Sequence, residues 1–312
     1  MTRHRHRNRF TFAFVTLLVL AFPALGRPYV LIVQSSPIEA YQQAVAGFTQ
    51  YFTTTSLPGI ASIQPNEIII LGQATSETVA NRYQEVKPEL VIAVGTSALE
   101  VVKGFTTPII YLMVPNPDAI TKGQGNIVGI SMMTDPEQQL SAIKATFPAA
   151  TRVAIIHNPA RNGDYVKLVR AAQSRFRLTV TDLPVNDDKE ALNLLSSQSN
   201  HFDALLLTPD PSLITPILMN GLALYSLEQH VPLVAFAPKY LDQGAAMVVY
   251  TSPEQAGKQA AELAKRSLSG QLGTSMRQEY GREATRLTND RIIQKLGIPT
   301  SRSQGDQEVL LP

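Results

Sequence analysis

The chain has 312 residues, of which 27 are basic and 25 acidic, with 44% hydrophobic side chains and no cysteine. This composition supports a sizeable buried core and excludes disulfides, thiolate metal sites and a cysteine nucleophile. It also excludes a lipid-modified N-terminal cysteine, so an exported form is expected to be soluble or held by an uncleaved segment.

The first 26 residues are typical of an export signal. Four arginines precede an apolar run over 10–25, and small residues at Ala24 and Gly26 suit signal peptidase. We expect cleavage after Gly26; the alternative is a membrane anchor, although the run is shorter than the roughly 20 residues of a spanning helix. Cleavage leaves 23 basic and 25 acidic side chains, a net charge of −2. We therefore expect a periplasmic location and no nucleic-acid partner.

The next part of the chain alternates apolar runs with amphipathic stretches. Most apolar runs are continuous, which is typical of strands buried on both faces of a parallel sheet. We predict strands at 29–33, 68–71, 90–94 and 109–114, with a last run near 127–130. We predict helices at 39–51, 76–86 and 97–102.

The alternation of apolar runs and amphipathic stretches starts again after a helix with a predicted N-cap. Asp135-Pro136-Glu137 offers an N-cap, a first-turn proline and a first-turn acid, and Ser252-Pro253-Glu254 repeats this pattern. We predict strands at 153–157, 178–181, 204–207, 233–236 and 246–250. We predict helices at 136–147, 164–176, 189–197, 214–229 and 253–268.

The two series predict an α/β protein with two Rossmann-like lobes, each a mainly parallel sheet flanked by helices. We expect the chain to cross between the lobes near 131–134, again after the strand at 246–250, and a third time within 270–281. The expected division is 1–26 signal peptide, 27–132 plus 252–276 first lobe, 133–251 plus 277–299 second lobe, and 300–312 flexible tail. A single sheet of about nine strands is the alternative.

Polar side chains follow four of the predicted strands, where ligands of open α/β sheets bind. In the turn after 90–94, a glycine and the free N–H groups of a helix start suit a carboxylate, and plain helix capping is an equal alternative. In the turn after 204–207, an acid between two prolines suits an ammonium group, although an Asx turn is the simpler interpretation. The candidate ligand-binding residues are Ser35, Ser36, Gly95, Thr96, Ser97, Asn158, Asn162 and Asp210.

Other side chains near these turns are weaker candidates. Arg161 can pair with a carboxylate, but a loop arginine more often faces solvent, and His157 at a strand end is more often structural. An apolar or aromatic wall is expected, for which the candidates are Tyr41, Tyr111, Tyr165 and Tyr240.

Catalysis has little support in the sequence. Beyond the leader only His157, His201 and His230 are present, no two at metal-ligand spacing, and no nucleophile-elbow, phosphate-loop or dinucleotide motif occurs. We therefore expect no enzyme activity, no cofactor, no metal site and no catalytic residue.

Taken in order, these turns resemble the ABC transporter substrate-binding family that includes tryptophan- and tyrosine-binding proteins. The resemblance extends over about 29–299, and its most specific segments are 88–96, 125–131, 147–153 and 296–299. It implies a type I periplasmic binding fold with a three-stranded hinge and a ligand clamped in the cleft. It further implies that Gly95, Thr96 and Ser97 hold an amino-acid carboxylate and that Asp210 faces the ammonium, with contributions from Asn158 and Ser36.

The function expected from this resemblance is capture of a small molecule, an amino acid or related carboxylate, for an ABC importer, by a protein that acts as a monomer. The alternative is a sensor that presents its closed form to a periplasmic receptor or histidine kinase without transport. A third alternative is an enzyme on the same fold.

Overall fold

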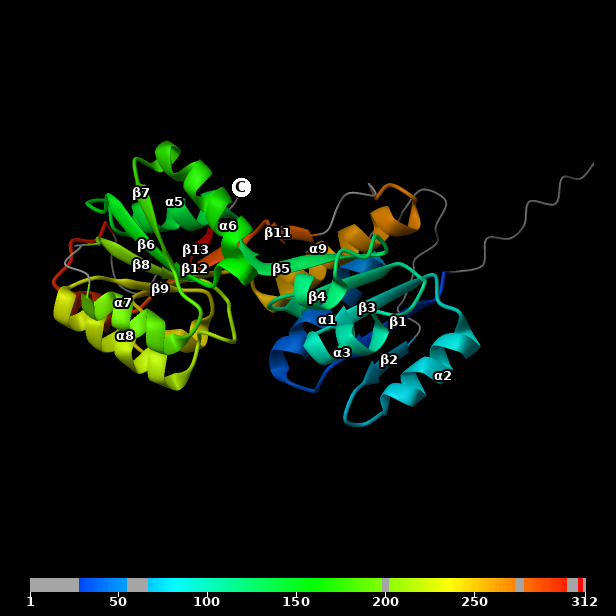
Figure 1. Ribbon diagram of the computed structural model, residues 1–312. Helices are drawn as coiled ribbons and strands as arrows, with labels where there is room; N and C mark the ends of the chain where they lie inside the picture. Colours follow the sequence, from blue (N-terminus) through cyan, green and yellow to red (C-terminus); the bar gives the residue numbers. More distant parts are fainter. Residues whose placement is uncertain (1–27, 55–66, 198–201, 273–277, 302–307, 311–312) are drawn as a thin grey trace, which may run out of the picture.

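The computed structural model describes residues 28–54, 67–197, 202–272, 278–301 and 308–310. The expected export signal lies outside these residues. The described chain forms two sheets in two lobes, which lie side by side with β5 (Ile127–Thr134) and β11 (Gln278–Gly281) running between them (Figure 1). The predicted two-lobed α/β fold is therefore confirmed.

The first lobe contains a six-stranded sheet in the order β11-β5-β4-β3-β1-β2, and all its pairs are parallel. Every residue of β1 and β3 is buried, as continuous apolar runs predict for strands covered on both faces. The remaining strands are β1 (Val30–Gln34), β2 (Glu67–Ile70), β3 (Leu90–Val94) and β4 (Ile109–Val114). The helices are α1 (Glu39–Thr54), α2 (Ser76–Val86), α3 (Thr96–Val102) and α4 (Asp118–Thr121).

The second lobe contains a seven-stranded sheet in the order β13-β12-β10-β9-β8-β6-β7, parallel from β7 to β10 and antiparallel at β12 and β13. Its strands are β6 (Arg152–His157), β7 (Thr179–Pro184), β8 (Ala204–Leu207), β9 (Leu233–Ala235), β10 (Met247–Tyr250), β12 (Ala284–Thr288) and β13 (Glu308–Leu310). Its helices are α5 (Pro136–Thr146), α6 (Pro159–Ala172), η1 (Gln173–Phe176), α7 (Asp188–Ser197), α8 (Pro216–Gln229), η2 (Pro238–Tyr240) and α10 (Asp290–Leu296).

The chain crosses between the lobes three times. β5 pairs with β4 in the first sheet, and at its end the Thr134 hydroxyl donates to the carbonyl of Val249 in β10. After β10 the chain returns as α9 (Pro253–Leu268), which packs on α1 in the first lobe. The third crossing follows β11, which pairs with β5, and leads into β12 of the second sheet. The hinge is thus made of segments that are far apart in the sequence.

Several details differ from the expectations. The strand Gln278–Gly281 belongs to the first sheet, although we expected residues from 277 in the second lobe; its polar sequence gives no strand signal of its own. Residues 308–310 pair with β12, although we expected a flexible tail from 300. The helix α6 begins at Pro159 and not at 164, because Asn158 caps it and Pro159 fits its first turn.

Candidate functional site

In the first lobe, the turn after β3 is built around Gly95. Its φ of 89° lies in the left-handed region, and a Cβ there would stand 2.7 Å from both the Ser35 hydroxyl and the Tyr41 ring. The Ser35 hydroxyl also accepts a 2.8 Å hydrogen bond from the backbone N–H of Ala98, in the first turn of α3. The turns after β1 and β3, which the sequence placed in one site, are therefore in direct contact.

The hydroxyl residues of this turn face outward. Thr96 and Ser97 are exposed, and among the described residues their backbone N–H groups have no hydrogen-bond acceptor. Ser36 is half-buried, and its carbonyl accepts a 2.6 Å bond from the Gln34 side chain. The predicted lobe-1 residues thus form one polar surface at the carboxyl ends of β1 and β3.

In the second lobe, the predicted acid is not accessible. The Asp210 side chain is 0% exposed, and its Oδ1 accepts hydrogen bonds from the Ser212 N–H at 2.9 Å and the Ser212 hydroxyl at 2.7 Å. Its Oδ2 is buried and has no hydrogen-bond partner among the described residues. The Asx-turn interpretation therefore describes Asp210 in this conformation, and an ammonium group cannot reach it without a rearrangement.

The two predicted asparagines stabilise and anchor the start of helix α6. The Asn158 side chain accepts from the N–H of Ala160 at 3.0 Å, and the Asn158 carbonyl accepts from both Arg161 and Asn162. Asn162 is buried, and its Nδ2 donates to the Thr208 hydroxyl at 2.9 Å, which ties α6 to the turn after β8. Because these contacts satisfy the first N–H groups of α6, its N-terminus is not free to bind an anion.

Arg161 has a different environment from its neighbours. Its side chain is 39% exposed, and its Nε lies 3.8 Å from Oδ1 of the buried Asp210. No other contact of this guanidinium to a described residue is found. The buried acid therefore compensates part of the arginine's charge and leaves most of its five N–H donors available.

His157 ends β6 directly before α6. The ring is 3% exposed, and neither of its nitrogens has a hydrogen-bond partner among the described residues. Burial lowers the pKa of His157, while the charge of Asp182 and the Asn158 backbone act in the opposite direction with smaller effect. The imidazole is therefore neutral at pH 7.

A cavity of about 630 Å³ brings the two lobes together at the carboxyl ends of β4 and β6. Its lobe-1 wall is the turn 115–119, and its lobe-2 wall is the start of α6, including Arg161 and Asn162. Ser131 of β5 and Tyr280 of β11 close it toward the hinge. The other predicted residues, Ser35, Ser36, Gly95, Thr96, Ser97, Asn158 and Asp210, are not part of its lining.

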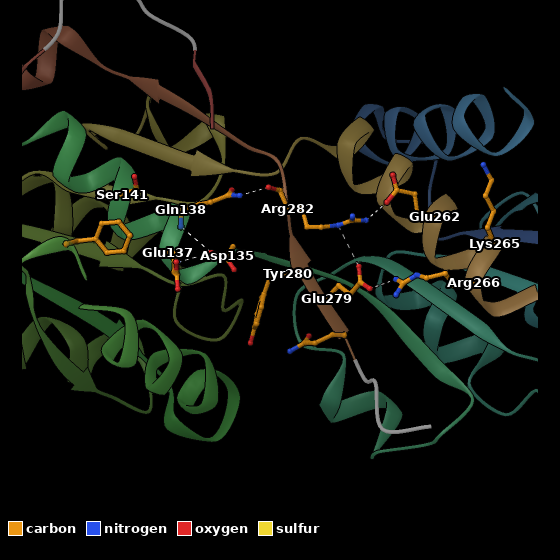
Figure 2. A pocket seen from close by; sticks show the side chains of 12 residues that line it. Asp135, Glu137, Gln138, Ser141, Glu262, Lys265, Arg266, Glu279, Tyr280 and Arg282 are labelled. Atoms are coloured by element: carbon orange, nitrogen blue, oxygen red, sulfur yellow. Dashed lines mark hydrogen bonds and ion pairs between the residues drawn. The ribbon is translucent and has the colours of Figure 1, made fainter. Parts of the chain in front are cut away.

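A second cavity of about 970 Å³ lies on the hinge between α5 and α9 (Figure 2). Its charged groups are largely paired: Arg266 contacts Glu279, and Arg282 contacts Glu262 and lies 3.9 Å from Glu279. Burial by itself would raise the pKa of Glu279, but hydrogen bonds from Arg266 and Gln259 outweigh it, and the pKa is lowered. This cavity is larger but does not lie at the strand ends where α/β ligand sites form.

The expected aromatic wall is formed only in part. Tyr41 packs beside Gly95, and Tyr165 lines the 630 Å³ cavity while its hydroxyl donates to the Thr134 carbonyl at 2.9 Å. Tyr111 and Tyr240 are 2% and 4% exposed and belong to the hydrophobic cores of their lobes. In Tyr240 this burial raises the pKa to about 12.

Of the six charged side chains that line the cavity, the sequence reasoning identified only Arg161 and missed the other five, Asp118 among them. Asp118 is exposed, begins the four-residue helix α4, and lines the lobe-1 wall. The segment Pro115-Asn116-Pro117-Asp118 follows a buried strand, which is the signal that could have identified it.

Among residues 28–54, 67–197, 202–272 and 278–301, no group of three or more His, Asp or Glu side chains is placed to hold a metal ion. In the same part of the chain, no helix combines the length and the apolar character that a bilayer crossing requires.

The chain is similar in fold to solved structures at low sequence identity. An adhesive substrate-binding protein from Clostridium difficile, in its ligand-free, open form, has a TM-score of 0.62 at 18% identity and covers 89% of this chain and 97% of its own. An ABC domain from Streptococcus pneumonia in complex with L-Trp has a TM-score of 0.55 at 16% identity, with coverages of 88% and 96%. No curated protein matches the sequence.

A sequence model of the ABC transporter substrate-binding protein family matches residues 72–304, about three quarters of the chain. This match extends through both lobes and the hinge described above, and the expected resemblance is confirmed. The chain belongs to the ABC transporter substrate-binding protein family.

Proposed function

We propose that this protein captures an amino acid or a related carboxylate in the periplasm and delivers it to the permease of an ABC importer. The observation that supports the proposal is the 630 Å³ cavity, whose walls come from both lobes at the carboxyl ends of β4 and β6. Its volume is within the range of small-molecule sites. A solute that contacts both walls favours the closed arrangement of the two lobes.

The class of solute is inferred from the polar groups at the strand ends. Arg161 presents a partly exposed guanidinium on the lobe-2 wall of the cavity. Thr96 and Ser97 lie outside the lining, at the carboxyl end of β3 in lobe 1, and present hydroxyls and N–H groups that have no acceptor among the described residues. Such donors suit carboxylates. The structural neighbour from Streptococcus pneumonia is a complex with L-Trp, which supports an amino acid as the first ligand class to test.

The first experiment identifies the solute. The protein is purified from its native host without added ligand, denatured, and the released small molecules are identified by mass spectrometry. We expect one amino acid or related carboxylate, which is then titrated into the refolded protein by calorimetry. If nothing copurifies and no member of a panel of amino acids and carboxylates binds, the proposal is wrong.

A second experiment separates delivery from sensing. Deletion of the gene is expected to abolish uptake of the identified solute by whole cells, and expression of the protein is expected to restore it. If uptake is unchanged although the purified protein binds the solute, the importer part of the proposal fails and the binding part stands.

A further inference from the structure

The charges that line the 630 Å³ cavity are mostly paired with each other. Lys167 Nζ lies 2.7 Å from Asp164 Oδ1, and Arg170 Nη1 lies 3.3 Å from Asp182 Oδ1. These pairs are exposed and contribute little to stability, but they neutralise four of the six charged side chains of the lining. The remaining two are Arg161 on the lobe-2 wall and Asp118 on the lobe-1 wall.

The Asp118 carboxylate makes no hydrogen bond or ion pair with any described side chain. Burial raises the pKa of Tyr280, and the charge of Asp118 raises it further. Asp118 is part of the cavity lining, as is Tyr280 of β11. Lobe 1 therefore presents an unpaired negative group to the cavity.

Arg161 on the opposite wall is held by an acid that the solute cannot reach. The Asp210 side chain is fully buried and accepts two hydrogen bonds from Ser212, and its Oδ1 lies 3.8 Å from the Arg161 Nε. An acid in this position orients the guanidinium and leaves its outer N–H groups for an anion. Asp210 is thus a positioning residue, and Arg161 is the group on lobe 2 that meets the solute.

From this arrangement, and resting on the proposed function, we infer that the cavity binds a zwitterion with its carboxylate on Arg161 of lobe 2 and its ammonium on Asp118 of lobe 1. This orientation is the reverse of the one expected from the sequence, in which lobe 1 held the carboxylate and Asp210 the ammonium. The two walls carry opposite charges, so one amino-acid backbone complements both, and its binding draws the lobes together.

The test uses ligands that lack one charge at a time. Calorimetry measures the binding affinity of three ligands: L-tryptophan, tryptamine, which lacks the carboxylate, and indole-3-propionate, which lacks the ammonium. A second set consists of L-leucine, isopentylamine and 4-methylpentanoate. For the wild type we expect each loss to weaken binding about 10- to 100-fold, the usual size of a hydrogen-bonded charge contact.

The variants assign each charge to its residue. R161Q is expected to bind the amino acid and its amine equally well, and D118N to bind the amino acid and its deaminated acid equally well. R161K keeps the charge without the planar guanidinium, and its preference for the amino acid over the amine is expected to lie between those of the wild type and R161Q. R291Q is the control, because Arg291 is exposed on α10, outside the cavity lining, and the substitution removes the same charge from the same lobe.

Three outcomes overturn the inference. If T96A and not R161Q removes the preference for a carboxylate, the orientation expected from the sequence is correct. If R161Q and D118N weaken all three ligands equally, the two residues pair with each other on closure and do not recognise the solute. If the wild type binds none of the amino acids, the inference fails together with the amino-acid class of the proposed function, whereas in the first two cases that function stands.

Melting temperatures, read in parallel, show that each variant is folded. Removal of the arginine leaves Asp210 buried without a cation, which is destabilising. R161K avoids this loss of charge, so a reduced carboxylate selectivity in R161K at wild-type melting temperature supports recognition by the guanidinium.

Discussion

At the scale of single residues, the burial of His157 predicts how the stability of the fold depends on pH. Burial lowers its pKa in the folded protein, whereas in the unfolded chain it is near the ordinary value of about 6.5. Between these two values the unfolded state binds more protons, so stability is complete above about pH 6.5 and falls as the pH decreases. We expect the free energy of unfolding to fall between pH 7 and 5 by at most about 1.4 kcal/mol per pH unit from this group.

The variant H157F keeps a ring of similar size and cannot be protonated. We expect its melting temperature, followed by calorimetry, to depend less on pH over 5–7 than that of the wild type. Carboxylates with lowered pKa, such as Asp203 and Glu279, remain charged in this window and lose their contribution only below about pH 4. An unchanged pH profile in H157F would show that His157 is not the titrating group.

At the scale of elements, the contact between α1 and α9 depends on two glycines. These helices are about 200 residues apart in the chain, and a Cβ on Gly257 would lie 2.0 Å from the Ala44 carbonyl oxygen. A Cβ on Gly47 would lie 2.2 Å from the Glu254 carbonyl oxygen. Because the obstacles are backbone atoms, the helices must separate to admit a methyl group.

We therefore expect G257A to destabilise the first lobe by about 1–3 kcal/mol, the usual cost of overpacking, although alanine gains about 1 kcal/mol of helix propensity. Denaturant unfolding with a probe in each lobe measures the effect. G104A is the matched control, since a Cβ at Gly104 meets nothing within 4 Å and φ there is not positive. Equal stability of G257A and wild type would mean that α9 is not held this closely.

The sequence predicts elements well where local signals and burial agree. Leu90–Val94 is an unbroken apolar run, and Asp135-Pro136 caps a helix where expected. The strand Gln278–Gly281 could not be predicted, because it has no apolar pattern and exists through pairing with β5. Arg161 and Asp210 form an ion pair between two turns that are far apart in the sequence. Residue type alone does not show which of the two faces the cavity, because this depends on burial in the fold: Asp210 is buried and supports Arg161, which is partly exposed.

At the scale of the whole molecule, the hinge limits how the lobes move. The second and third crossings touch at Gly281 and Thr251: a Cβ on Gly281 would lie 1.8 Å from the Thr251 hydroxyl and 2.6 Å from its Cβ. That hydroxyl is buried and has no hydrogen-bond partner among the described residues, so its position reflects packing and not a polar contact. A rotation of the lobes must be accommodated where these two segments pass each other.

A methyl group at this point is expected to obstruct closure while leaving each lobe folded. For G281A we expect about 10-fold weaker binding of the solute, because the binding-competent closed state becomes less populated. We also expect a smaller ligand-induced decrease in radius of gyration by small-angle X-ray scattering. The double variant G281A/T251G removes the obstructing side chain and should restore both, since the two changes act through one contact. If the double variant still binds the solute weakly while its circular dichroism matches that of the wild type, the contact between Gly281 and Thr251 does not control closure. The rotation of the lobes then depends on the first crossing, β5.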